Sequence, residues 1–149
     1  MYNFHEVTML KFNKCMQKDT NRLYELSTNL INTYEKSNVD YEFIYNWINN
    51  KLINEIHDYY QILYNNTHVG YIHIINENEI EIDDFYIFDE YQNMGIGTIV
   101  LNTIINKSTK NIFLYVFIKN EKAISLYKKL GFKIIENIKD SRYIMRLSR

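Results

Sequence analysis

The chain has 149 residues, of which 46% are hydrophobic and 23% are charged, and its formal net charge is −1. This length suits one domain with a buried core, and no apolar run approaches a membrane span. We expect no secretory signal, and the single cysteine, Cys15, excludes an internal disulfide, so a cytoplasmic protein is predicted.

The charges are distributed unevenly along the chain. Residues 1–106 hold 6 Lys/Arg and 15 Asp/Glu, whereas residues 107–149 hold 11 and 3. Two interpretations stay open: ordinary solvated faces, or an acidic surface for a cationic ligand beside a basic surface for an anionic one. No continuous basic stripe is present, so nucleic-acid binding is not expected.

The N-terminal half predicts a strand, two helices and a hairpin. A β-rich run at residues 6–12 is the first strand. The helices begin at Asp19 and Asp40, each an N-cap before apolar residues at three- and four-residue spacing. Two further β-rich runs, residues 59–64 and 69–75, flank a four-residue polar turn, as in a hairpin.

The C-terminal half predicts four strands and two helices. The strands are expected at residues 80–88, 112–118, 132–138 and 143–147. The segment 112–118, IFLYVFI, is apolar throughout, which is typical of a strand buried on both faces. One helix ends near Ser108, and the other runs from its cap Asn120 to Gly131. The order β-α-α-β-β-β-α-β-α-β-β predicts a single α/β domain over residues 1–149, with helices packed on a mixed sheet.

The stretch QNMGIGT, residues 92–98, contains two of only four glycines. It joins a strand to a helix, where the first amides lack helical partners and the helix dipole adds about half a positive charge. Gly95 and Gly97 let an anionic group approach the main chain without meeting a Cβ. The stretch therefore favours an anion-binding loop, and the alternative is a tight connection with nothing bound.

A second segment, NEKAISLY, places Asn120 and Tyr127 seven residues apart on a predicted helix. Two helical turns separate them, so they share a face, with the small Ala123 between them. This stripe could border a narrow channel, or Tyr127 could be an ordinary core residue.

Together the two segments resemble the GNAT superfamily of acetyl-CoA-dependent N-acetyltransferases. FYIFDEYQNMGIGTIVL is similar to its acetyl-CoA signature, and NEKAISLYKKLGF is similar to its Asn…Ala…Tyr…Gly-Phe segment. The resemblance covers residues 69–147, while residues 1–60 carry no specific match. It implies a GNAT-like fold, acetyl-CoA as co-substrate and a small-molecule amine acceptor. The chemistry needs no metal, and with no apolar run of membrane length no membrane partner is expected. Dimers are common among similar proteins, so a homodimer is also an expectation.

Carried over by position, the resemblance assigns cofactor binding to Phe85, Tyr86, Ile87, Gln92, Asn93, Met94, Gly95, Ile96, Gly97, Thr98, Asn120 and Ala123. The amides of residues 93–98 would hold the pyrophosphate, with Gln92 supporting the loop. The main chain of residues 85–87 would pair with the pantetheine arm almost like an added strand. Asn120 would hydrogen-bond to the pantetheine.

The resemblance also assigns catalytic roles. Tyr127 would lie beside the thioester sulfur, where a phenol of pKa ~10 can protonate a departing thiolate of pKa ~8.5 as a general acid. Glu81 and Asp83 alternate with apolar residues, face one side of their strand, and are alternative general bases; both could instead belong to a solvated acidic stretch. His68 and His73 would face opposite sides of a strand, so no metal site is expected.

Three functions from different classes stay open at this point. The leading hypothesis is N-acetyltransfer to a primary amine. A catalytically inactive CoA-binding sensor or assembly domain and a noncatalytic interaction domain are the alternatives. Residues 19–60, with seven carboxylates, three Lys/Arg and many aromatic rings, favour a small cationic amine as the acceptor.

Overall fold

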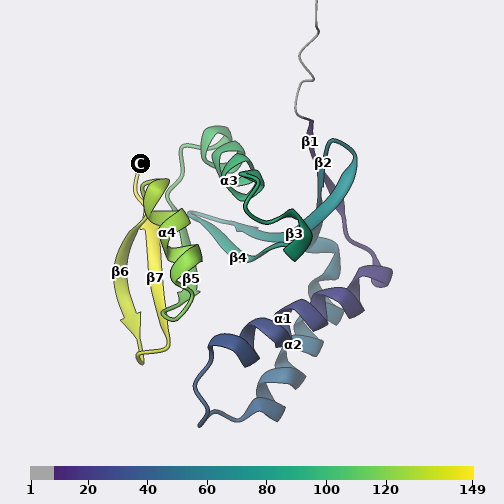
Figure 1. Cartoon of the computed structure of the whole chain (residues 1–149), viewed down its shortest axis with the longest axis vertical. Coiled ribbons are helices and arrows are strands. Elements are labelled where there is room, and N and C mark those ends of the chain that lie inside the picture. The colour runs from purple at the N-terminus through teal and green to yellow at the C-terminus, as the bar shows by residue number, and fades with distance from the viewer. Residues whose placement is uncertain (1–8) are drawn as a thin grey trace, which may run out of the picture.

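A computed structural model describes residues 9–149 of the chain (Figure 1). Its helices and strands follow the predicted order, and the predicted α/β fold class is confirmed. They are β1 (Leu10–Lys14), α1 (Thr20–Tyr34), α2 (Tyr41–Glu55), β2 (Tyr59–Tyr64), β3 (Thr67–Asn76), β4 (Ile80–Ile87), α3 (Ile96–Lys107), β5 (Ile112–Phe117), α4 (Glu121–Lys129), β6 (Lys133–Ile138) and β7 (Arg142–Leu147).

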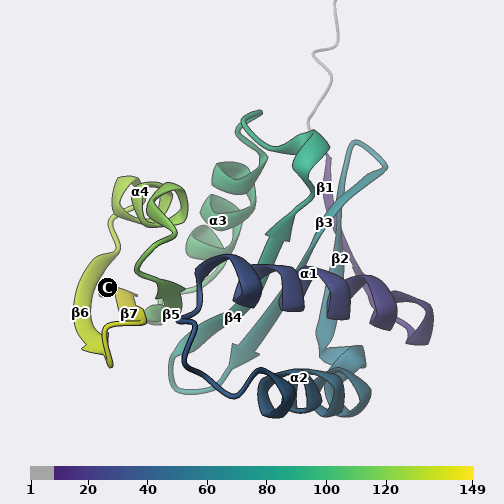
Figure 2. The ribbon, with the colours of Figure 1, turned by 60° about the horizontal axis from the view of Figure 1, so that its bottom comes forward.

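The strands form one seven-stranded sheet in the order β1-β2-β3-β4-β5-β7-β6. All neighbours are antiparallel except β4 and β5, which are parallel. That parallel pairing is short, running from Ile80↔Ile112 to Ile82↔Leu114. Beyond these pairs the two strands separate, and Figure 2 shows β4 and β5 diverging. The edge of β4 that faces β5 is therefore unpaired from Asp83 onward.

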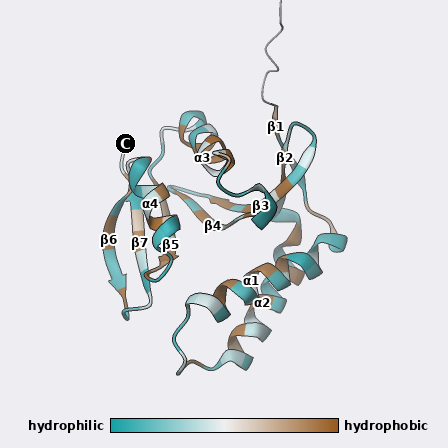
Figure 3. Cartoon of the chain, viewed as in Figure 1, coloured by the Kyte–Doolittle hydropathy of each residue, from teal (hydrophilic) through white to brown (hydrophobic). Residues whose placement is uncertain are grey.

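Helices cover both faces of the sheet. Figure 1 shows α3 above the sheet and α1 and α2 below it. The α3 side packs Val100 and Leu101 into one hydrophobic cluster, and the α1–α2 side packs Leu23 and Leu52 into another. In Figure 3 hydrophobic and hydrophilic residues alternate along α1, as expected for a helix with one buried face.

Several predicted boundaries need correction. The first strand begins at Leu10, and residues 6–8 lie outside the described part of the chain. The hairpin turn has two residues, Asn65 and Asn66, because both adopt left-handed backbone angles (φ 48° and 66°) that suit a tight two-residue turn.

The two predicted helix caps behave differently. Asp40 accepts a hydrogen bond from the amide of Phe43, at 3.1 Å, and caps α2 as expected. Asp19 makes no capping bond to α1. Its carboxylate instead accepts bonds from the Met16 amide and from the side chains of Gln61 and Tyr71, which join the start of α1 to β2 and β3.

β5 is not buried on both faces, which corrects the prediction from its apolar sequence. Tyr115 is 43% exposed. The reason is that the α2 side of β5 borders a cavity where β4 has moved away, so a large side chain there stays accessible.

Two β-bulges change which side chains share a face. Between β3 and β4, His73 pairs with Asp84 but Ile74 pairs with Ile82, so Asp83 is an extra residue. A register shift between β2 and β3 lies near Gly70. His68 and His73 consequently both contact aromatic residues of the α1–α2 cluster, so the prediction that they face opposite sides is wrong.

Candidate active site

Two cavities meet where β4 and β5 separate. The larger, of about 960 Å³, runs along QNMGIGT and α4 and is called the glycine-loop cavity. The smaller, of about 210 Å³, lies against α2 and is called the α2-side cavity. The residues that line both are Leu30, Phe85, Tyr86, Asn120, Ala123 and Tyr127. A molecule in one cavity would therefore meet a molecule in the other cavity beside Tyr127.

The glycine loop presents unpaired amides at the start of α3. The first helical bond joins the Ile99 amide to the Gly95 carbonyl, at 3.1 Å, so the amides of residues 96–98 have no helical acceptor. Gly95 has φ +80°, a backbone conformation that is strained for residues with a side chain. An added Cβ there would meet nothing within 4 Å. The site is thus an open cradle that suits an anion.

Side chains of the loop differ in where they lie. Gln92 donates from Nε2 to the Ile87 carbonyl at 2.9 Å, which ties the loop to the end of β4. The predicted loop residues that line the cavity are Gln92, Asn93, Gly95, Ile96, Gly97 and Thr98. Met94 does not line it, and its side chain is exposed, so the structure does not bring this predicted residue into the cavity.

Gly97 has a different environment from Gly95. An added Cβ would lie 3.5 Å from Leu126 Cδ2 and 3.8 Å from the Phe85 ring, which are ordinary van der Waals distances. Packing therefore does not require a glycine here, and the bare position keeps the cavity open instead.

Helix α4 places Asn120, Ala123 and Tyr127 along the cavity junction, as their spacing predicted. The Asn120 side chain accepts from the Ala123 amide at 3.3 Å, which leaves its NH₂ group available. Tyr127 is 8% exposed, and burial raises its pKa to about 12. Its phenol is therefore protonated across the neutral pH range.

The unpaired edge of β4 carries Phe85, Tyr86 and Ile87, all of which line the glycine-loop cavity. An extended ligand could pair with this edge in place of the missing length of β5.

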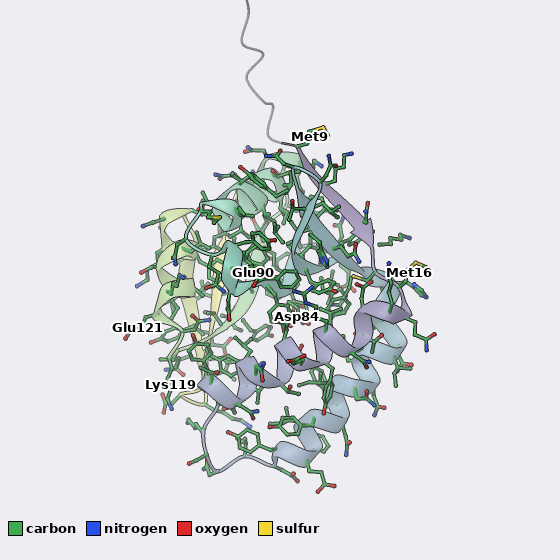
Figure 4. The ribbon with its side chains drawn as sticks, turned by 45° about the vertical axis from the view of Figure 1, so that its right-hand side comes forward. Met9, Met16, Asp84, Glu90, Lys119 and Glu121 are labelled. Carbon is green, nitrogen blue, oxygen red and sulfur yellow. The ribbon has the colours of Figure 1, made fainter. Side chains whose placement is uncertain are left out.

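The bulge in β4 brings two consecutive carboxylates, Asp83 and Asp84, to the α2-side cavity. Figure 4 shows Asp84 between the sheet and helix α1. Lys51 of α2 forms ion pairs with both, and the distance from its Nζ to Asp84 Oδ2 is 3.2 Å. His73 Nδ1 lies 2.7 Å from Asp83 Oδ2, and Tyr59 donates to Asp84. The two acids and Lys51 thus form a connected network at the wall of the cavity.

The two predicted bases have opposite electrostatic environments. Burial disfavours the ionised form of Asp83, but the His73 hydrogen bond and Lys51 outweigh it and hold its pKa below the ordinary value. Burial and the neighbouring charge of Asp83 raise the pKa of Glu81. Glu81 lines neither cavity and forms no ion pair among residues 9–149. Asp83 is thus close to the cavity but weakly basic, whereas Glu81 is more basic but set back.

Sequence reasoning missed three members of this network: Asp84, Lys51 and His73. A signal was present in the strand IEIDDFYI, where two adjacent acids interrupt the alternation of polar and apolar residues. Such an interruption is typical of a β-bulge. No comparable signal marks Lys51, because its position depends on how α2 packs.

His73, Asp83 and Asp84 place three potential metal-ligand atoms within 4.8 Å of one another. The ammonium of Lys51 already bonds to both carboxylates, so the cluster contains its own cation. The expectation of no metal stays a prediction.

Cys15 is buried, and burial together with the charge of Asp19 raises its thiol pKa to about 12. A thiol in this environment is a poor nucleophile.

The acidic residues of the two N-terminal helices do not reach the site. None of the seven carboxylates in residues 19–60 lines either cavity. Of the aromatic residues there, Trp47 and Tyr59 line the α2-side cavity and Tyr34 lines the other. The acidic residues that line the cavities are Asp83 and Asp84 of β4 and Asp89, which follows β4.

The profile of the acetyltransferase (GNAT) family matches residues 18–132. The chain belongs to the GNAT acetyltransferase family. The predicted resemblance is confirmed, and the match includes both the glycine loop and the segment of Asn120 and Tyr127. No helix in residues 9–149 is both long and apolar enough to cross a membrane.

Individual relatives of this GNAT acetyltransferase match over different lengths. N-alpha-acetyltransferase 50 of Danio rerio is 40% identical over 73 residues, which are 46% of this chain and 44% of that protein. The chain thus matches less than half the length of this curated relative.

Two solved structures share the fold over nearly the whole chain. PaiA N-acetyltransferase from Thermoplasma acidophilum, in complex with coenzyme A, superimposes with a TM-score of 0.69 at 24% identity and covers 95% of this chain and 99% of that one. Arabidopsis thaliana Naa50, in complex with the bisubstrate analogue CoA-Ac-MVNAL, has a TM-score of 0.63 at 24% identity, covering 94% and 99%.

Proposed function

We propose that this chain is a single acetyltransferase domain that transfers the acetyl group of acetyl-CoA to a primary amine. The observation that carries the proposal is the junction of two cavities at Tyr127, with an amide cradle in one and a carboxylate network in the other. A two-substrate transfer needs such a junction, because the reacting atoms must approach to about 3–3.5 Å.

The glycine-loop cavity fits acetyl-CoA. Unpaired amides at residues 96–98 suit the pyrophosphate, and the free edge of β4 suits the amide-bearing pantetheine arm. Lys122 and Lys129 also line this cavity and add positive charge for phosphate groups. When bound, acetyl-CoA supplies an acetyl thioester, whose carbonyl carbon accepts the amine nitrogen as its bond to sulfur breaks.

Tyr127 supports the leaving group as a general acid. Its phenol makes no hydrogen bond within residues 9–149 and lines the cavity junction. It donates its proton to the departing sulfur and regains one from solvent. With a pKa near 12, Tyr127 gives up its proton at a higher free-energy cost than an ordinary tyrosine. The hydrogen bond from its hydroxyl to the developing thiolate is therefore its main contribution to stabilising the transition state.

Glu81 is the general base that we favour over Asp83. The amine must lose its proton to become a nucleophile, and a raised carboxylate pKa brings Glu81 closer to the working pH. Because Glu81 lines neither cavity, it takes the proton through a water molecule. Asp83 is committed to Lys51 and His73.

For the acceptor we propose a small cationic amine. The sequence suggested this acceptor from the acidic and aromatic residues of the whole segment 19–60. In the structure the support comes from fewer residues, the carboxylates of Asp83 and Asp84 and the rings of Trp47 and Tyr59. The printed names of relatives include N-alpha-acetyltransferases, so a peptide N-terminus is the acceptor to compare with it.

A thermal-shift measurement and a CoA-release assay test this proposal together. Acetyl-CoA at 100 times its dissociation constant is expected to stabilise the fold by ~2.7 kcal/mol. The assay uses a monoamine, a polyamine, an aminoglycoside and a peptide with a free N-terminus, with mass spectrometry of the products. Stabilisation without turnover of any amine would indicate a CoA-binding sensor, and no stabilisation would indicate an interaction domain.

A further inference from the structure

A cation-binding position already exists in the α2-side cavity, and the protein's own side chain fills it. The ammonium of Lys51 lies between Asp83 and Asp84 and is 5.2 Å from the ring centroid of Trp47. All four residues line the cavity. Two carboxylates and an indole face are the groups that bind alkylammonium ions in proteins.

The two acids have three further hydrogen-bond partners besides Lys51. His73 contacts Asp83, while Tyr59 and Tyr86 donate to Asp84, the latter at 3.2 Å. The side chains of Asp83 and Asp84 are only 19% and 18% exposed. Without Lys51, two poorly hydrated negative charges would lie side by side and would attract another cation.

The charges that line this cavity also balance. Lys51 and Arg142 oppose Asp83 and Asp84, and no other Asp, Glu, Lys or Arg among residues 9–149 lines it. Arg142 forms no ion pair in the described part of the chain and lies 5.3 Å from the ring centroid of Tyr115. A second ammonium on an acceptor would therefore meet two like charges and no unpaired carboxylate.

We propose that Lys51 determines acceptor specificity by filling the cation position between Asp83 and Asp84, so that the cavity favours amines with a single ammonium over diamines. This inference rests on the proposed function and narrows its acceptor class. The reacting amine loses its proton before it attacks and so needs no carboxylate partner of its own, and the rest of the acceptor is uncharged. Trp47 and Tyr115, which are 56% and 43% exposed, provide apolar surface for that part.

The test compares butylamine with 1,4-diaminobutane, which share a four-carbon chain and differ in the second ammonium. CoA release is measured for the wild type and for Lys51→Met, which keeps an unbranched apolar side chain and removes the charge. The wild type is expected to have the higher kcat/KM with butylamine. In Lys51→Met the ratio is expected to shift toward 1,4-diaminobutane by at least about tenfold, and less so at 1 M salt, where the Debye length is ~3 Å.

Matched variants separate charge from packing. Lys51→Arg keeps the charge and is expected to keep the wild-type ratio. Lys110→Met removes a surface lysine bonded to Asn76 and Glu77, away from both cavities, and is expected to change nothing. Asp84→Asn leaves Lys51 in place, and the ratio is expected to shift further toward butylamine; this holds even if Lys51→Met does not fold. An unchanged ratio in Lys51→Met, or in Asp84→Asn, overturns the inference.

Failure of the inference can be distinguished from failure of the proposed function. If the wild type acetylates none of the amines, the proposed function fails. Calorimetry of 1,4-diaminobutane with each protein then tests the cation position directly. Binding at least about tenfold tighter to Lys51→Met than to the wild type supports the inference, and equal affinities overturn it.

Discussion

At the scale of single residues, Tyr127 is one of the six residues that line both cavities. Tyr127→Phe keeps the ring, which packs 5.8 Å from the Phe132 ring, and removes only the hydroxyl. We expect kcat to fall by about 10²-fold while the affinity for acetyl-CoA and the melting temperature stay near wild type. Steady-state kinetics and calorimetry measure these quantities. Tyr60→Phe removes a hydroxyl outside both cavities and serves as the control; wild-type turnover in Tyr127→Phe would show that the hydroxyl takes no part.

The pH dependence of the rate separates Glu81 from Asp83. A base works only when deprotonated, so kcat/KM is expected to fall as the pH drops through the raised pKa of Glu81. Glu81→Gln is expected to remove this acid limb and to slow turnover by about 10²-fold. Asp83→Asn removes a negative charge that raises the pKa of Glu81, so the limb is expected to move to lower pH.

The pH profiles of the same two variants would also identify Asp83 as the base. If Asp83→Asn abolishes the acid limb while Glu81→Gln retains it, Asp83 is the base despite its lowered pKa.

At the scale of elements, β3 and β4 leave no room for a side chain at Gly70. An added Cβ would lie 1.9 Å from the carbonyl oxygen of Tyr86, and backbone cannot yield as a flexible side chain can. Gly70→Ala is therefore expected to destabilise the fold by about 3 kcal/mol, measured as a lower urea midpoint. Since Tyr86 belongs to the free edge of β4, acetyl-CoA affinity is expected to fall as well. An unchanged urea midpoint would show that β3 and β4 move apart at residue 70 without a measurable loss in the free energy of unfolding.

Local patterns predicted most elements of this fold and one side of its site. Caps at Asp40 and Asn120, the left-handed Gly131 and the periodicity of the helices are short-range features, so they can be identified along the chain. The glycine loop and the stripe from Asn120 to Tyr127 are also local. The extra residue Asp83 and the contact with Lys51 are not, because strand register and helix packing depend on residues far apart in sequence.

At the scale of the whole molecule, the basic C-terminal part contributes Lys122 and Lys129 of α4 to the glycine-loop cavity. Lys122 Nζ lies 3.3 Å from Oε1 of Gln92, the first residue of the glycine loop, and both residues line the cavity. Raising the salt concentration from 0.1 M to 1 M shortens the Debye length from ~10 Å to ~3 Å. We expect the dissociation constant of coenzyme A to rise by about tenfold over this range. Pantetheine, which lacks the nucleotide phosphates, is the control and is expected to respond little; an equal response would mean that phosphate charge contributes nothing.

Because the pairing between β4 and β5 is short, the polypeptide can be divided into two fragments at this point. Three residue pairs join the two parts of the sheet, and the chain passes between them once, through α3 and residues 108–111. A cut in this polar connection would give two fragments of opposite net charge, one carrying the glycine loop and the other carrying Asn120 and Tyr127. Co-expressed, they are expected to reassociate, more tightly with acetyl-CoA than without it. Acetyl-CoA would then hold the two fragments together, and the extent of fragment complementation would report the concentration of acetyl-CoA.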